Sequence, residues 1–219
     1  TGDDTFVNIL NAIREGYLDD EMLETLNKRY NPDFTLPPGE MWVTLAATNR
    51  VANERNAEEL SRINSTEFTS TAAITGDTKG FTYPTEQILK YKVGSQIMMI
   101  NNAASGAWVN GTIATITNVD STIPHAPMIS ARTEDGRIIS FSYNTWEITS
   151  PKAGKHGLDY DVIGSFTQLP FKLAWAITIH KSQGQTLNNA IIDLTGGTYA
   201  TGQLYVALSR CTSLTGMVL

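Results

Sequence analysis

The sequence is poor in cysteine and histidine, which excludes cross-links and standard metal centres. Its 219 residues include one cysteine, Cys211, so no internal disulfide can form, and a reducing, cytosolic setting fits best. With that one cysteine, the three scattered histidines do not match the spacing of a zinc site. We therefore expect no bound metal, and we expect Cys211 to be a small buried apolar residue.

Long apolar runs and an excess of basic residues are also missing. No apolar stretch approaches the length of about 18 residues that a membrane-spanning helix needs, and mean hydropathy is −0.16. No signal-peptide pattern opens the chain. The formal net charge of −6 disfavours an autonomous, sequence-blind nucleic-acid binder, which would usually be basic. Any nucleic-acid contact must therefore rest on a local strip of specific residues within an acidic body.

Nucleotide-binding and hydrolase signatures are absent as well. The chain contains no Gly-x-x-x-x-Gly-Lys-Ser/Thr phosphate loop, and no acidic Mg²⁺-holding motif follows a predicted strand. The Ser, His and Asp pattern of a nucleophile-elbow hydrolase is also missing. The sequence begins abruptly with an acidic stretch and ends inside the apolar run 216–219, so we expect it to be part of a longer polypeptide.

The two ends of the chain carry an α/β pattern. Residues 3–30 predict two helices, whose inward-facing residues are Phe6, Ile9, Leu10, Ile13, Met22, Leu23 and Leu26. A loop rich in proline follows at 31–39. A buried strand at 42–46 and a helix from Val51 predict the strand–loop–helix unit of a parallel sheet. Strands at 173–179 and 190–194 and a helix over 202–210 continue this character.

The middle of the chain predicts an antiparallel architecture. Residues 61–83 suit an exposed β-rich excursion, and the strands expected after it lie at 97–100, 111–119, 128–133 and 137–143. Asp135-Gly136 is a hairpin signal, and 151–166 is expected to be a polar link. We therefore predict an α/β parallel-sheet domain at 1–90 and 166–219, interrupted by a small antiparallel β-barrel or sheet at 91–165.

The segment 176–186 (Ala-Ile-Thr-Ile-His-Lys-Ser-Gln-Gly-Gln-Thr) places polar residues where a buried strand ends. Ligands of open α/β sheets bind at that carboxyl edge. The hydroxyls of Thr178 and Ser182 can take phosphate oxygens, and His180 and Lys181 can add a donor or charge. Gly184 lets the backbone come close to a phosphate or a neighbouring domain. On composition alone, a polar loop with a turn glycine explains the segment at least as well.

The segment 202–210 (Gly-Gln-Leu-Tyr-Val-Ala-Leu-Ser-Arg) predicts a helix that ends at Arg210. An arginine that projects from a rigid element into another domain's nucleotide site is an arginine finger. Its planar guanidinium matches phosphate oxygens and stabilises charge on a transferred γ-phosphoryl group. Viewed alone, Arg210 also fits a solvent-exposed residue favoured by the helix dipole.

Together, these two segments resemble motifs V and VI of superfamily 1B DNA helicases of the PIF/RecD-like type. Residues 6–16 resemble the opening helix of that family, and Thr48-Asn49 with Asn56 and Leu60 resembles its Thr-Asn segment. Residues 93–99 with 109–112 resemble its inserted Src-homology-3-like barrel. The resemblance covers nearly the whole chain. It implies the C-terminal, second RecA-like half of an ATP-dependent 5′-to-3′ DNA helicase, which in the P-loop NTPase fold is the half without the P-loop.

The resemblance also implies roles for single residues. Arg210 would contact the γ-phosphate of ATP, and Gln183 and Gly184 would help to sense it. The residues expected along single-stranded DNA are Thr48, Asn49, Thr178, His180, Lys181 and Ser182. ATP and Mg²⁺ would be held mainly by the N-terminal RecA-like domain of the same protein. This chain alone is therefore expected to carry no cofactor and to be inactive as an ATPase. Such a protein would be cytoplasmic or nucleoid-associated and would act in DNA repair or recombination.

Two alternative functions stay open: a stand-alone nucleic-acid-binding module, and a non-catalytic helicase remnant used for protein contact. Trp108 is a further candidate DNA contact, because aromatic side chains stack bases in single-strand binders. Packing at the barrel rim explains Trp108 more simply. The other tryptophans are predicted to be core residues, and His125 and His156 are predicted to lie in exposed polar segments.

Overall fold

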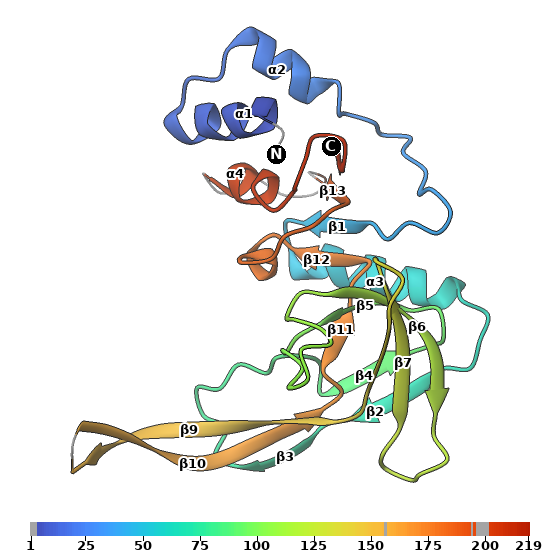
Figure 1. Ribbon diagram of the computed structural model, residues 1–219, viewed down its shortest axis with the longest axis vertical. Helices are drawn as coiled ribbons and strands as arrows, with labels where there is room; N and C mark the ends of the chain where they lie inside the picture. The colour runs from blue at the N-terminus through green and yellow to red at the C-terminus, as the bar shows by residue number, and fades with distance from the viewer. Residues whose placement is uncertain (1–3, 156, 194, 196–201) are drawn as a thin grey trace. The chain divides into compact units, whose positions relative to one another are not determined.

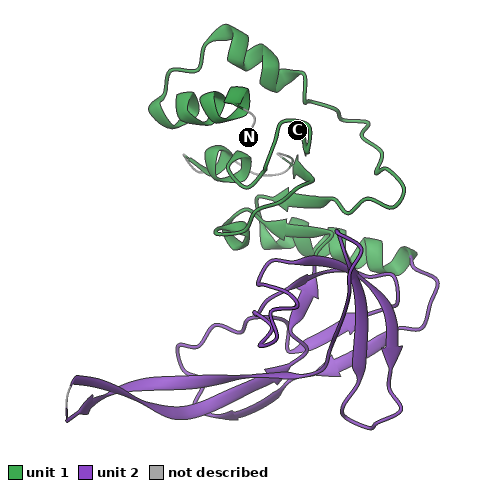
Figure 2. Cartoon of the chain, viewed as in Figure 1, with its two compact units in different colours: residues 1–62, 174–219 green, residues 63–173 purple. Residues whose placement is uncertain are grey.

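The computed structural model describes residues 4–155, 157–193, 195 and 202–219, and the chain forms two compact units (Figures 1 and 2). The first unit comprises residues 1–62 and 174–219, and the second comprises 63–173. The second unit is therefore wider than the predicted insertion at 91–165. The difference arises because two strand pairs within it bring in chain from both sides of that range: β2 (Phe68–Thr71) with β4 (Ile88–Tyr91), and β11 (Phe171–Leu173) with β5 (Gln96–Met99).

A four-stranded parallel sheet forms the centre of the first unit, which confirms the predicted α/β character. Its order is β12 (Ala176–Thr178), β1 (Val43–Ala46), β13 (Ala190–Asp193) and β14 (Met217–Val218). All four residues of β1 are buried, as expected for an inner strand of a parallel sheet. The strand predicted at 173–179 is broken instead, because 171–173 pair in the second unit and 176–178 pair in the first. Of the strand predicted at 190–194, Leu194 lies outside the described residues.

Four helices accompany this sheet: α1 (Asp4–Glu15), α2 (Asp20–Asn27), α3 (Asn49–Arg62) and α4 (Gln203–Leu208). The α1 helix buries Phe6 and Ile9, and it ends at Gly16, whose φ of 76° suits the left-handed cap of a helix. In α2, Leu26 is buried as predicted. Leu23 is 46% exposed, so its predicted inward position is wrong. That short helix turns only one position, Leu26, fully into the core.

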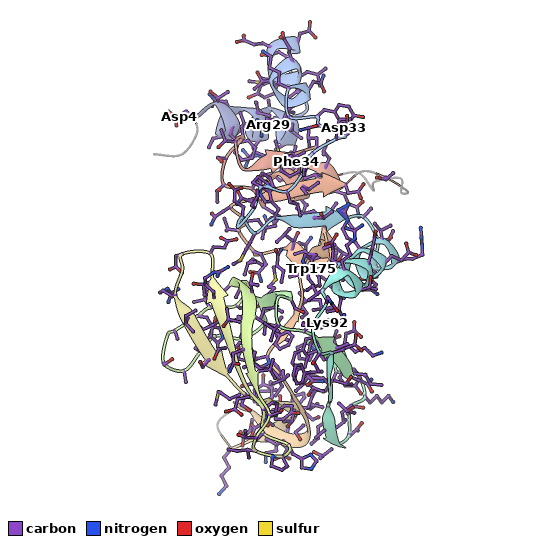
Figure 3. All side chains as sticks on the ribbon, turned by 90° about the vertical axis from the view of Figure 1, so that its right-hand side faces the viewer. Asp4, Arg29, Asp33, Phe34, Lys92 and Trp175 are labelled. Atoms are coloured by element: carbon purple, nitrogen blue, oxygen red, sulfur yellow. The ribbon has the colours of Figure 1, made fainter. Side chains whose placement is uncertain are left out.

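The chain after α2, where Figure 3 labels Arg29, is hydrogen-bonded to the C-terminal strand. Arg29 Nε donates to the Met217 carbonyl at 2.9 Å, and the Leu219 N–H donates to the Arg29 carbonyl at 3.0 Å. In the proline-rich loop that follows, the rings of Phe34 and Trp42 lie with their centroids 4.7 Å apart. These contacts tie the loop to the first unit at both of its ends.

The second unit is built from antiparallel strands in three sheets. A five-stranded sheet has the order β11-β5-β6-β7-β8, a three-stranded sheet β3-β10-β9, and a two-stranded sheet β2-β4. The strands are β2 (Phe68–Thr71), β3 (Ala73–Gly76), β4 (Ile88–Tyr91), β5 (Gln96–Met99), β6 (Ile113–Asp120), β7 (Met128–Thr133), β8 (Ile138–Phe141), β9 (Asn144–Gly154), β10 (Gly157–Gln168) and β11 (Phe171–Leu173). The hairpin at Asp135-Gly136 is confirmed, and the antiparallel character of this region is as predicted. Closure into a Src-homology-3-like barrel stays a prediction.

Residues 151–154 and 157–166 form part of a long β-hairpin, so the predicted polar link is wrong. Strands β9 and β10 pair from Gly154 with Gly157 to Asn144 with Gln168. The outer part of β10 is open to solvent, and Leu158, for example, is 70% exposed. Backbone pairing rather than a buried face therefore holds this part of the hairpin together.

A buried polar cluster centred on Gln168 lies inside the second unit. The Gln168 side chain is fully buried, and its Oε1 accepts from the Ser70 hydroxyl at 2.8 Å and from the Leu169 N–H at 2.9 Å. Its Nε2 lies within hydrogen-bonding distance of the Ser70 carbonyl (3.0 Å) and of two further backbone carbonyls. The Ser70 hydroxyl also bonds Tyr143 Oη at 2.9 Å. One buried amide thus supplies partners to the polar groups around it, among them the Leu169 N–H.

Candidate functional site

The carboxyl edge of the parallel sheet brings together the polar turns that follow β1 and β12. Ala46, the last residue of β1, is in register with Thr178 of β12, and the Ile179 N–H donates to the Ala46 carbonyl at 3.0 Å. The residues exposed in these two turns are Thr48, Asn49, His180 and Lys181. The sheet register therefore places four of the predicted DNA-contact residues at one edge.

The turn after β1 leads directly into α3. Thr48 caps this helix, because its hydroxyl accepts from the Val51 N–H at 3.3 Å and its carbonyl accepts from the Ala52 N–H at 3.2 Å. The free N–H groups and the positive end of the helix dipole therefore lie at the carboxyl edge of the sheet. This is an environment that suits an anion.

The turn after β12 is a short 3₁₀ helix, η1 (His180–Ser182). Two of the predicted DNA-contact side chains are buried here: Thr178 is 5% exposed and Ser182 is 0% exposed. Thr178 Oγ1 accepts from the Lys181 N–H at 3.2 Å, and the Ser182 hydroxyl donates to the Ile179 carbonyl at 2.6 Å. Both hydroxyls are thus engaged in shaping the turn, while His180 and Lys181 project to solvent.

Gln183 and Gly184, which follow η1, are both exposed. Gly184 has a φ of 79°, and a Cβ at its position would meet no atom within 4 Å. The need for glycine is therefore conformational rather than steric, because side chains disfavour this left-handed region.

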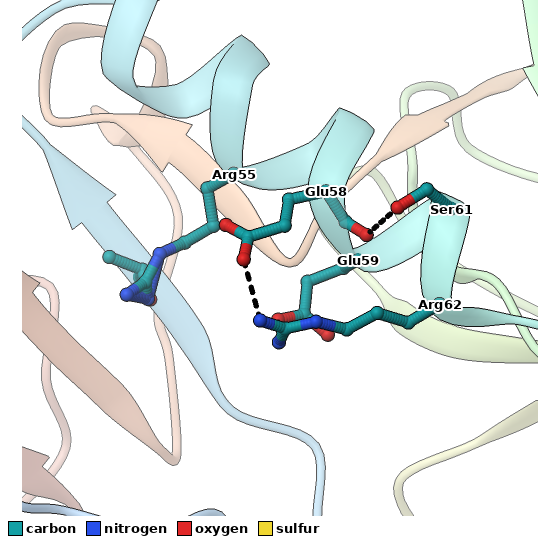
Figure 4. A network of polar contacts seen from close by, with 6 residues as sticks. Arg55, Glu58, Glu59, Ser61 and Arg62 are labelled. Carbon is teal, nitrogen blue, oxygen red and sulfur yellow. Dashed lines mark hydrogen bonds and ion pairs between the residues drawn. The ribbon is translucent and has the colours of Figure 1, made fainter.

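The α3 helix is fastened to the sheet by two polar side chains. Asn56 bonds both backbone groups of Ala176, since its Nδ2 donates to the carbonyl and its Oδ1 accepts from the N–H, each at 2.8 Å. Arg55 Nη1 donates to Thr44 Oγ1 of β1 at 3.1 Å. Arg62, on the solvent side of the helix, instead pairs with acidic residues of α3 (Figure 4). The sequence analysis names Asn56 as part of the Thr-Asn segment, but nothing in the sequence indicates its two bonds to Ala176.

Arg210 follows the end of α4 and is partly buried. Its Nη2 donates to the Ser209 hydroxyl at 3.1 Å, whereas its buried Nε has no hydrogen-bond partner among the described residues. Its carbonyl accepts from the Leu187 N–H at 2.7 Å, which anchors it beside the segment that leads from Gly184 to β13. The guanidinium forms no ion pair within the described part of the chain.

The neighbouring Cys211 is buried, as the sequence predicted. Burial raises the pKa of its thiol to about 12, and the nearby Arg210 charge opposes this shift. The thiol is therefore protonated at neutral pH and is not a nucleophile.

The structure accounts for Trp108 as a packing residue of the second unit. Its ring meets that of Phe141 edge-on, with centroids 5.8 Å apart, and its Nε1 donates to Asn101 Oδ1 at 2.9 Å. His125 is exposed in the loop after β6, and His156 lies outside the described residues. The described residues contain no group of three or more potential metal ligands and no helix long and apolar enough to cross a membrane.

Asp193 ends β13 at the same carboxyl edge and was not among the predicted site residues. Its Oδ1 accepts from the Thr195 N–H at 2.8 Å. An acidic residue at the end of a strand carries no sequence signal that separates a site residue from a turn former.

Comparison with known proteins relates the chain to one kind of enzyme. No protein-family model matches the sequence. The ATP-dependent DNA helicase Pif1 of Bdellovibrio bacteriovorus is 30% identical over 98% of this chain and 46% of its own length. The structure of Bacteroides sp Pif1 in complex with ADP-AlF4 superposes with a TM-score of 0.87 at 30% identity, over 100% of this chain and 49% of that one. Bacteroides Pif1 bound to ssDNA gives a TM-score of 0.69 at 30% identity, over 99% and 48% of the two chains. The chain thus spans less than half the length of these relatives.

Proposed function

Because the chain belongs to the Pif1-like family of DNA helicases, we propose that it is the second RecA-like domain, with its β-rich insertion, of an ATP-dependent helicase that moves 5′ to 3′ on DNA. The observation that carries this proposal is the convergence of exposed polar residues after β1 and β12 at one sheet edge. Open α/β sheets bind their ligands at that edge.

The ligand of this edge is the backbone of single-stranded DNA. Thr48, Asn49, His180 and Lys181 offer hydrogen bonds and one fixed positive charge, and such groups contact phosphates without reading bases. The N-terminus of α3 adds its dipole. The buried hydroxyls of residues 178 and 182 act by shaping the turn that presents Lys181. The Bacteroides relative solved with ssDNA supports this choice of ligand.

Arg210 serves as the arginine finger for ATP. Its partial burial, its buried unpartnered Nε and its anchorage next to Leu187 support this role, because a pre-positioned guanidinium without an ion pair is available to a phosphate. Gln183 and Gly184, on the segment that leads to Leu187, sense the same γ-phosphate. ATP and Mg²⁺ are held mainly by the N-terminal RecA-like domain of the whole protein, since the sequence has no phosphate loop.

The decisive experiment measures ssDNA-stimulated ATP hydrolysis by the whole protein. Arg210→Ala should lower turnover by about 10³ or more, the range found for arginine fingers. Arg14→Ala, which removes an exposed arginine of α1, is the matched control and should keep wild-type turnover. Unchanged turnover in Arg210→Ala would remove the finger assignment. Salt-dependent ssDNA binding without ATPase in the whole protein would favour a stand-alone binding module, and no ssDNA binding would favour a remnant used for protein contact.

A further inference from the structure

Strand β12 lies at one edge of the parallel sheet, and β1 is its strand neighbour there. The Thr44 N–H donates to the Trp175 carbonyl at 2.8 Å, and the Ile179 N–H donates to the Ala46 carbonyl at 3.0 Å. The backbone groups of alternate residues on a strand point to opposite sides, so those of Ala176 point away from β1. At a sheet edge such groups need a partner other than a strand.

The side chain of Asn56 provides that partner. An asparagine amide carries one carbonyl and one NH₂ group, so it can copy the donor and acceptor of a neighbouring strand. Both bonds measure 2.8 Å, and the Asn56 side chain is partly buried, whereas Asn53 on the same helix is exposed. Together with the Arg55–Thr44 bond to β1, the Asn56 side chain holds the α3 helix in place along β12.

We propose that Asn56 is a positioning residue for single-stranded DNA, which locks the two turns of the carboxyl edge at one spacing. Asn56 lies two helical turns after Asn49 in α3. Its partner Ala176 is the first residue of β12, the strand that leads to His180 and Lys181. The two Asn56–Ala176 bonds, called the clamp below, therefore connect both DNA-contacting turns through α3 and β12. This inference rests on the function proposed above, and it assigns to Asn56 a role in DNA affinity rather than in folding alone.

The test uses the whole protein with the substitution Asn56→Asp. The aspartate keeps an oxygen for the Ala176 N–H, but it places a second oxygen against the Ala176 carbonyl and so breaks one bond. The ssDNA concentration for half-maximal ATPase stimulation should rise by up to about tenfold, because loss of one hydrogen bond lowers the fraction of molecules whose turns have the binding arrangement. Turnover at saturating ssDNA should stay within about twofold of wild type, because Asn56 contacts no nucleotide. Asn53→Ala should match wild type in both quantities.

If Asn56 served folding alone, the substitution would change turnover rather than the half-saturating ssDNA concentration. Loss of folded protein lowers turnover at saturation and leaves the half-saturating ssDNA concentration unchanged, and that result in Asn56→Asp would overturn the proposal. If the variant does not fold, hydrogen exchange on the wild-type protein decides. The Ala176 amide should be protected and gain protection when oligothymidine binds, and identical exchange with and without DNA would overturn the proposal.

Failure of this inference can be told apart from failure of the proposed function. If Lys181→Ala and wild type bind ssDNA equally well, the DNA surface itself is misassigned. If Lys181→Ala weakens binding while Asn56→Asp does not, only the clamp is misassigned.

Discussion

Replacing Lys181 with alanine should change the salt dependence of ssDNA binding without disturbing the turn. The Lys181 side chain is exposed, and its ammonium group forms no ion pair among the described residues. The bond that shapes η1 is donated by the backbone N–H of residue 181, so it does not depend on the lysine side chain. The substitution therefore removes one available positive charge and little else.

The size of the effect follows from counterion release. Each phosphate that a protein neutralises on single-stranded nucleic acid contributes about 0.7 to the slope of log K against log salt concentration. Loss of one ammonium–phosphate contact should make the slope shallower by about 0.7. Between about 50 and 200 mM salt, the variant should then lose about 2.6-fold less affinity than the wild type.

Fluorescence anisotropy with a labelled oligothymidine, recorded across this salt range on the whole protein, provides the measurement. Lys28→Ala is the matched control, because Lys28 directly follows α2, is exposed and is already paired with Glu24. Its slope should equal that of the wild type. Equal slopes for Lys181→Ala and wild type would refute the assignment of Lys181 to a phosphate. Ser182→Ala should lower stability and leave the slope unchanged, because the Ser182 hydroxyl is buried.

Three further outcomes follow from the structure, all measured by urea unfolding. Gln168→Leu should lower the free energy of unfolding by about 2–4 kcal/mol, because it leaves buried partners unsatisfied. Thr145→Ala on the same hairpin is the control and should lower it little. Equal losses in the two variants would count against a stabilising role of the Gln168 cluster. Gly184→Ala should cost about 1–2 kcal/mol, the strain of a left-handed residue with a side chain, and no loss would argue against that conformation. The free energy of unfolding should fall as pH rises from 9.0 towards about 12, because the folded state raises the pKa of Cys211 and so holds its proton more tightly than the unfolded chain. A Cys211→Ala variant should show a weaker decline over this range, and an identical decline would contradict the assignment to this thiol.

The elements of the first unit could be predicted because their patterns are local. The apolar spacing of α1 and the strand–loop–helix pattern of β1 and α3 each reflect burial of a single face. The carboxyl ends of parallel strands lie at one edge of the sheet, so the turns at 48–49 and 179–182 could be expected to share an edge, whereas their register is seen only in the structure. The resemblance to helicases was recognised mainly from the residue sequences of segments 176–186 and 202–210.

The failures concern properties that depend on distant chain. Leu158, Tyr160 and Val162 alternate as a strand requires, but the glycines and charges around them suggested a link, and the pairing with β9 is not visible in their own sequence. The burial of Thr178 and Ser182 depends on how the turn folds back, so a hydroxyl that binds phosphate and one that binds its own backbone look alike in sequence. The bonds from Asn56 to Ala176 join residues 120 positions apart.

The Asn56 amide also occupies backbone groups of the edge strand β12 that another strand could otherwise pair with. An open edge strand is a template on which a foreign strand can add, and natural proteins block such edges with charges, bulges or covering elements. Here the blocking group is tethered to α3, so an incoming chain would have to displace two short hydrogen bonds before it could pair. The edge at β12 is thereby a poorer template for strand addition, while the turns at the carboxyl ends of β1 and β12 keep their exposed polar residues.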